Sequence, residues 1–210
     1  MAKIKRRFSS RPVMAALPTT KPQLERLLSA RGWGATLLSA ELTPTLTPTL
    51  APTLTPKLAN GSAPAVRPHR GLTLLYPAGA GGGVTSAALR AAAQALAAPA
   101  AVAAWVDGTD ALDPESAARA GLHLDRLLWL PAAGAPLAEL LALTQMLLAA
   151  ARFHAVVLDV LSRPMAELER WPRAAWFRLL RGLERHRRSQ LWVLAPAALP
   201  APSAVTKVAV

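Results

Sequence analysis

Short apolar runs and longer amphipathic segments alternate along the chain from residue 71 onward. Five of the apolar runs have the length and composition of strands buried on both faces, and they cover residues 72–76, 101–106, 127–130, 155–160 and 190–195. Segments with helical periodicity lie between them, at residues 85–97, 114–120, 136–151 and 173–188. This alternation predicts an α/β fold, with a mostly parallel sheet of five to six strands and helices on both faces. An edge strand at residues 204–210 would be the sixth.

Two of the predicted helices have a clear apolar stripe. In the helix at 136–151 the stripe consists of Leu137, Leu140, Leu141, Thr144, Leu147 and Leu148. In the helix at 173–188 the stripe consists of Trp176, Leu179, Leu180 and Leu183, and the opposite side carries Arg178, Arg181, Arg185 and Arg188. This arginine row either contacts phosphates, contacts an acidic partner or forms a solvated face. Trp171, which precedes Pro172, is either a core residue or an anchor in a protein contact.

The first third of the chain differs in composition from the rest. Residues 1–41 form a basic arm that includes a short helical pattern. Residues 42–70 are rich in Thr and Pro, and a proline at about every fourth position denies the backbone helical hydrogen bonds and a place in a sheet. We therefore predict four parts: the arm, an extended linker at 42–70, a folded core at 71–195 and a proline-rich tail at 196–210.

The charge of the chain changes sign along its length. Residues 1–70 carry 11 Lys or Arg and 2 Asp or Glu, residues 71–162 carry 4 and 7, and residues 163–210 carry 9 and 3. The formal net charge of +12 therefore comes from the two outer segments. Basic segments of this kind attract nucleic acid or acidic protein surfaces, or they serve only solubility.

The composition excludes several classes of site. The chain has no cysteine, which excludes disulfides, thiolate metal sites and a cysteine nucleophile. The four histidines do not have the spacing of a metal site, so we expect no metal and no other cofactor. No apolar run approaches the ~20 residues of a membrane-spanning helix, so we expect no membrane partner and a cytoplasmic protein.

A glycine-rich loop follows the first predicted strand, at the place where a P-loop would lie. A working P-loop reads GxxxxGK[ST]: backbone N–H groups and the Lys bind phosphate, and the hydroxyl binds Mg²⁺. In the window at 77–84, Pro77 replaces the first glycine and Gly82 keeps the second. Gly83 stands in place of the Lys, and Val84 stands in place of the hydroxyl residue. The segment is either a degenerate nucleotide site or a flexible glycine loop.

A second segment resembles a known family. Residues 105–114, W-V-D-G-T-D-A-L-D-P, resemble the segment F-I-D-A-E-H-A-L-D-P of RecA recombinases, and residues 156–159, V-V-L-D, are similar to the Walker B strand of RecA. The resemblance covers about residues 71–195 and implies a RecA-like P-loop core with the strand order 3-2-4-5-1. Thr109 stands at the position of the catalytic glutamate of RecA, and a threonine is not a general base at neutral pH. The degenerate nucleotide site would then consist of Pro77, Gly79, Gly82, Gly83, Val84, Thr85, Asp107, Thr109 and Asp159.

A RecA-like core with a degenerate phosphate loop is similar to the ImuA family of the bacterial SOS mutagenesis cassette. This resemblance implies a non-catalytic accessory protein of SOS-induced mutagenesis and translesion DNA synthesis. Its expected partners are RecA, an ImuB-type Y-family-like adaptor and an error-prone polymerase, and self-association through the same surfaces is a further expectation. Such a protein would be cytoplasmic and would associate with the nucleoid when bound to the DNA damage machinery.

Three alternatives remain open on the sequence. In these alternatives the chain would be a weak or atypical P-loop ATPase, a DNA-binding accessory protein that uses the arginine row, or, more remotely, a SulA-like inhibitor of cell division. The first predicts Mg-ATP turnover that depends on Asp159. The second predicts salt-sensitive DNA binding that depends on the arginines.

Overall fold

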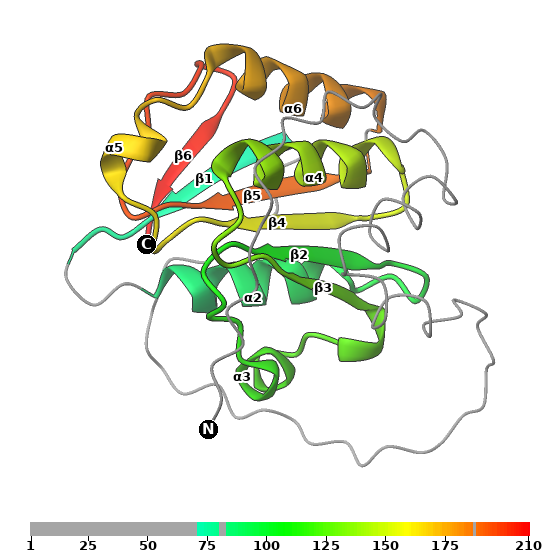
Figure 1. Cartoon of the computed structure of the whole chain (residues 1–210). Coiled ribbons are helices and arrows are strands. Elements are labelled where there is room, and N and C mark those ends of the chain that lie inside the picture. Colours follow the sequence, from blue (N-terminus) through cyan, green and yellow to red (C-terminus); the bar gives the residue numbers. More distant parts are fainter. Residues whose placement is uncertain (1–70, 80–82, 187) are drawn as a thin grey trace.

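The computed structural model describes residues 71–79, 83–186 and 188–210 (Figure 1). The predicted arm and linker, residues 1–70, lie outside the described residues. The strands are β1 (Gly71–Tyr76), β2 (Ala103–Asp107), β3 (Leu127–Pro131), β4 (Ala155–Asp159), β5 (Gln190–Leu194) and β6 (Thr206–Ala209). The helices are α2 (Val84–Ala95), α3 (Pro114–Arg119), α4 (Leu137–Ala149), α5 (Met165–Leu168) and α6 (Arg173–Arg185), with a short 3-10 helix, η1 (Leu124–Arg126).

The six strands of the described chain pair in parallel in one sheet with the order β3-β2-β4-β5-β1-β6. The predicted α/β class and the order 3-2-4-5-1 are therefore confirmed, and β6 is the predicted edge strand beside β1. Every residue of β2 and β4 is buried, because helices cover both faces of the sheet. Parallel pairing requires a crossover between successive strands, which explains why helices separate most of them.

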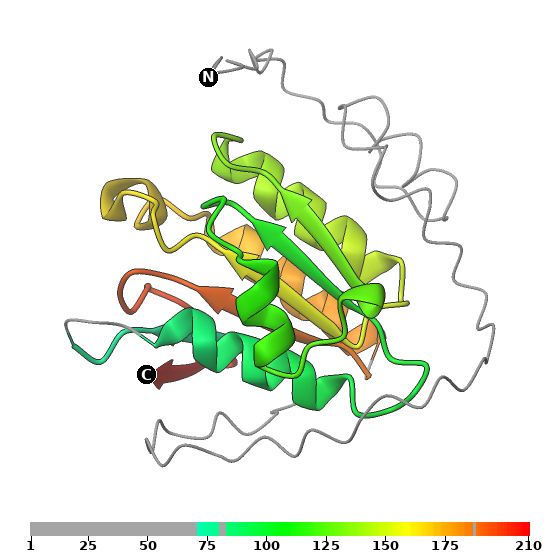
Figure 2. The ribbon, with the colours of Figure 1, turned by 90° about the horizontal axis from the view of Figure 1, so that it is seen from below.

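Two apolar layers lie between the sheet and its helices. α4 and α6 cover one face, and α2 and α3 cover the other (Figure 1 and Figure 2). All six residues of the predicted α4 stripe are buried, and Leu143 and Met146 are buried as well. In α6, Trp176, Leu179 and Leu183 are buried, whereas Leu180 is only partly buried. The predicted stripes therefore face the sheet.

Capping sets the start of one helix, and entry into a strand sets the end of another. The Asp113 carboxylate accepts hydrogen bonds from the backbone N–H groups of Glu115 at 3.3 Å and Ser116 at 2.9 Å, so α3 begins at the next residue, Pro114. The predicted helix at 173–188 is too long, because α6 ends at Arg185. The chain must turn there to enter β5, and the Ser189 N–H donates to the carbonyl of His186 at 2.9 Å.

Candidate functional site

The described residues of the predicted nucleotide site lie at the carboxyl edge of the sheet. Because β1, β2 and β4 are parallel, Pro77, Asp107 and Asp159 all lie at this edge. Asp107 and Asp159 are register partners in the pairing of β2 with β4, and their exposed fractions are 0% and 1%. Gly82 is the one member of the predicted site that lies outside the described residues.

The Asp107 carboxylate is saturated by the protein's own hydrogen bonds. Oδ1 accepts from the Thr109 N–H at 3.3 Å, the Thr109 hydroxyl at 3.0 Å and the Ala111 N–H at 3.2 Å. Oδ2 accepts from the Leu112 N–H at 3.0 Å and the Trp129 indole N–H at 3.1 Å. Five donors exceed the roughly four lone-pair sites of a carboxylate. Asp107 therefore holds the loop after β2 in place and has no free lone pair for a water or a ligand.

Thr109 has a structural partner as well. Its hydroxyl donates to Asp107 Oδ1 at 3.0 Å, and it also lies close enough to Asp159 to lower the pKa of that carboxyl. A threonine hydroxyl is also far too weakly acidic to act as a base on water at neutral pH. At this position the protein thus has a hydrogen-bond donor, where the RecA pattern has an acid.

The second carboxylate, Asp159, is buried but only partly satisfied. Its Oδ1 accepts a hydrogen bond from the Leu161 N–H at 3.0 Å, and its Oδ2 has no hydrogen-bond partner among the described residues. Burial raises the pKa of Asp159 to about 6, and the negative charge of Asp107 adds to the rise, while the Leu161 N–H and the Thr109 hydroxyl oppose it. At neutral pH, Asp159 is therefore an ionised group in a place that disfavours its charge.

Gly108 brings the loop after β2 into contact with the end of β4. Its N–H donates to the Asp159 carbonyl at 3.0 Å. A Cβ at this position would lie 2.6 Å from that carbonyl oxygen and 2.9 Å from Leu140 Cδ1. Only glycine fits without a shift of the backbone, so this position of the RecA-like segment has a packing function here.

The loop after β1 is tied to the end of β6. The Val210 N–H donates to the Tyr76 carbonyl at 2.9 Å, and the Ala78 N–H donates to the Val210 carbonyl at 2.8 Å. An N–H in the first half of the predicted phosphate loop is therefore already used within the protein. The half-buried Pro77 and the exposed Gly79 flank it.

The start of α2 lacks the side chains of a working phosphate loop. Gly83 is the N-cap residue and has no side-chain cap. Val84, which stands at the metal-binding hydroxyl position, is 3% exposed and packs into the core beside Leu75 and Ala88. Thr85 is half-buried on the first turn of the helix. The hydroxyl position has thus become part of the core.

Trp129 is a site residue that sequence reasoning missed. It lies on β3, next to β2 in the sheet, and its indole N–H reaches Asp107 across 22 positions of the chain. No local motif marks such a contact. The one available signal was the expectation that β3 pairs with β2, which places Trp129 in register with Trp105.

The arginines of α6 are separated from the carboxylates by the sheet. Arg178, Arg181 and Arg185 are exposed on α6, which covers the face opposite to α2. Arg188 is exposed in the turn that follows the helix, so it does not continue the helical row. The structure therefore does not combine the arginine row and the degenerate nucleotide site into one site.

Trp171 belongs to the core. Its exposed fraction is 5%, and its ring stacks on Trp176 with centroids 4.4 Å apart and an interplanar angle of 12°. Of the two interpretations of this residue, the structure supports packing under the start of α6. It does not offer this side chain to a partner.

Two further classes of site find no support within the described part of the chain. Residues 71–79, 83–186 and 188–210 contain no group of three or more His, Asp or Glu side chains that could hold a metal ion. None of the helices in these ranges is both long enough and apolar enough to cross a membrane.

Comparisons with known proteins do not assign a family. No protein-family model matches the chain, and no curated protein matches it. Among solved structures, the crystal structure of SulA from Pseudomonas aeruginosa is similar to 59% of this chain and to 97% of its own chain, with 25% sequence identity and a TM-score of 0.45.

Proposed function

We propose that this chain is a non-catalytic RecA-like accessory protein of SOS-induced mutagenesis and translesion DNA synthesis, and that it acts by binding other proteins. The observation that carries the proposal is the burial of Val84. A working P-loop places its metal-binding hydroxyl there, and here an apolar side chain, 3% exposed, is packed into the core. A single substitution back to Ser or Thr would leave the loop without its Lys as well, because Gly83 stands in that place.

The polar groups at the carboxyl edge support the same proposal. The Asp107 carboxylate is saturated by five donors, and the Thr109 hydroxyl is one of them. A general base must be free to accept a proton from a water molecule in hydrogen-bond reach. Neither residue meets this requirement, so Asp107 and Thr109 anchor the loop after β2, and Asp159 is left as the carboxylate of this edge with an oxygen that has no partner among the described residues.

A role in binding follows from the resemblance, which is an argument by analogy. RecA protomers pack the ATP face of one domain against the next protomer. A domain that keeps the sheet and its helices but lacks ATP chemistry would dock on RecA without extending the filament, or would recruit the ImuB-type adaptor and the error-prone polymerase. On this proposal the protein acts in the cytoplasm and is associated with the nucleoid while it is bound.

Nucleotide binding and partner binding can be measured separately on the full chain. Calorimetry with millimolar Mg-ATP should show no binding heat, and purified protein should not release phosphate above the blank. Immobilised chain should retain purified RecA or the ImuB-type adaptor. Turnover that falls on Asp159→Ala would instead identify a weak ATPase, and retention of neither protein would contradict the accessory role.

A further inference from the structure

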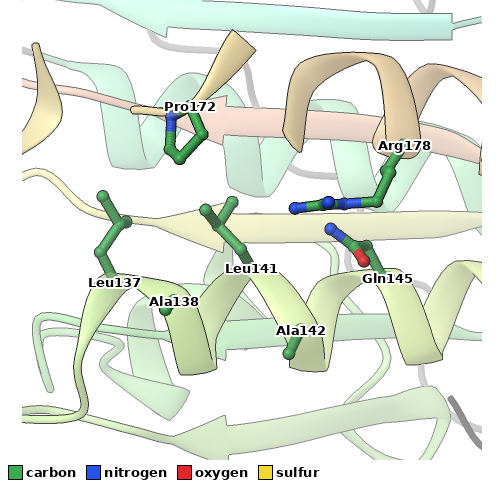
Figure 3. A pocket seen from close by; sticks show the side chains of 7 residues that line it. All are labelled: Leu137, Ala138, Leu141, Ala142, Gln145, Pro172 and Arg178. Carbon is green, nitrogen blue, oxygen red and sulfur yellow. The ribbon is translucent and has the colours of Figure 1, made fainter. Parts of the chain in front are cut away.

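A groove separates the first halves of α4 and α6 on the outside of the molecule (Figure 3). Its volume is about 170 Å³. Toward their ends the two helices touch, since a Cβ on Gly182 would lie 3.2 Å from the Leu148 Cβ. Near their starts the helices diverge, and Leu137, Leu141 and Pro172 line the space between them. The groove is therefore a product of how the two helices cross.

The lining is apolar except at one end. Leu137, Leu141, Ala142 and Pro172 contribute carbon atoms, whereas Gln145 and Arg178 contribute the polar ones. Figure 3 shows the Arg178 side chain reaching from α6 into the space between the helices, beside Gln145 of α4. A ligand that fits must therefore combine an apolar group with an acceptor for a guanidinium.

The rim along α6 is strongly basic. α6 contains four arginines and one glutamate. All four arginines, Arg173, Arg178, Arg181 and Arg185, are exposed, and none of them forms a salt bridge with another described residue. Phe177 is 50% exposed, more than any other large apolar side chain of the described residues. An exposed aromatic ring beside unpaired arginines is typical of a surface that binds a protein segment.

We propose that this groove binds an acidic amphipathic peptide segment of a partner protein. Apolar side chains of the segment would enter the groove between Leu137 and Pro172, and its carboxylates would pair with Arg178, Arg181 and Arg185. Charge argues against an occupant from this chain, because residues 1–70 have 11 basic and 2 acidic side chains and would be repelled. Nucleic acid would use the arginines and leave the apolar lining empty.

This inference goes beyond the proposed function and does not depend on it. The groove lies over the face of the sheet opposite to α2 and the loop after β1. It would bind its segment whether or not the degenerate loop binds ATP, and whether or not RecA is a partner. ATP binding and retention of RecA or the adaptor therefore test the proposed function, and peptide binding tests the groove, so that either proposal can fail while the other stands.

The test is a selection from displayed random peptides on the full chain. We expect the enriched peptides to combine Asp or Glu with apolar residues at helical spacing. A labelled copy of one such peptide is then titrated, by fluorescence anisotropy, against the chain and two groove variants. Ala142→Trp fills the groove, and the triple variant Arg178→Ala, Arg181→Ala, Arg185→Ala removes the rim charge.

Each groove variant has a matched control on the other face. Ala118→Trp adds the same ring to an exposed position of α3, and Arg90→Ala removes an exposed arginine from α2. We expect the triple variant to weaken binding about 10-fold, because an exposed ion pair contributes roughly 0.2–1 kcal/mol and 1.4 kcal/mol is a tenfold change. Ala142→Trp should abolish binding, and both controls should bind like the parent chain.

Five outcomes would overturn the inference. They are a selection that enriches no peptide, enriched peptides without acidic residues, and affinities unchanged by both groove variants. The fourth is displacement of the peptide by a single-stranded oligonucleotide. This oligonucleotide would itself bind the parent chain and the Ala142→Trp variant, but not the variant that lacks the three arginines. The fifth is concentration-dependent self-association of the chain that is lost in Ala142→Trp, which would mean that the groove binds a second copy of this chain.

Discussion

Asp159 allows a test in which the structure predicts a change of stability with pH. Burial raises the pKa of its carboxyl from 3.8 to about 6 in the folded chain, and one pKa unit corresponds to about 1.4 kcal/mol. Ionising Asp159 therefore costs about 3 kcal/mol more in the folded chain than in the unfolded chain. The folded chain binds this proton more tightly than the unfolded chain does. Protonation of Asp159 therefore stabilises the fold fully below about pH 4, and this stabilisation is lost as the pH rises to about 6.

The substitution Asp159→Asn removes the ionisation and keeps the shape of the side chain. Its amide oxygen can still accept the Leu161 N–H, although the added NH₂ carries a constant cost if it finds no acceptor. We therefore compare the difference in unfolding free energy, variant minus parent, at several pH values. Between pH 4 and pH 7 the parent should lose about 2–3 kcal/mol of stability relative to the Asn variant.

Urea unfolding of the full chain, followed by tryptophan fluorescence, measures this difference directly. Asp125→Asn is the matched control, because Asp125 is exposed on η1 and its removal should give a nearly constant difference. A difference for Asp159→Asn that stays constant across this pH range would refute the argument. So would a change in the opposite direction, which would mean that the folded protein stabilises the charge of Asp159.

Two further predictions concern the loop after β2. Gly108→Ala should destabilise the chain by about 1–3 kcal/mol, since the new Cβ would lie 2.6 Å from the Asp159 carbonyl oxygen. Gly79→Ala should be tolerated, since no atom of the described residues lies within 4 Å of its Cβ, and equal melting temperatures for the two variants would contradict this. Trp129→Phe should cost only about 0.5–1.5 kcal/mol in urea unfolding, because it removes the indole N–H donated to Asp107 but leaves four other donors to that carboxylate. A loss of more than about 3 kcal/mol would show that the four remaining donors do not satisfy the carboxylate.

Much of the fold could be predicted because its signals are local. Apolar runs and helical stripes place β1 to β5 and the larger helices, and the Asp113-Pro114 pair marks the start of α3. The end of α6 and the short α5 were not predicted. α5 is only four residues long, and the end of α6 depends on where the chain must turn into β5, which the periodicity of the helix does not contain.

The candidate site divides in the same way. The missing Lys, the valine at the hydroxyl position and the threonine at the acid position are read from the sequence alone, because they concern which chemical groups exist. The exposure of the α6 arginines also follows from helical spacing. Arg178 differs from its neighbours, since it enters a groove that exists only because α4 and α6 diverge near Pro172.

The order of apolar and polar residues by itself determined the class of the fold, the pattern of its core and the loss of the phosphate-binding side chains, since each depends on neighbours within a few positions. Tertiary structure alone decided that the Trp129 indole joins the four donors that Asp107 finds in its own loop, that Asp159 keeps an oxygen without a partner among the described residues, and that Gly108 must lack a side chain. These properties arise where strands distant in the sequence lie side by side. Hydrogen-bond partners, desolvation and close contacts depend on distances in space, and a linear sequence does not contain them.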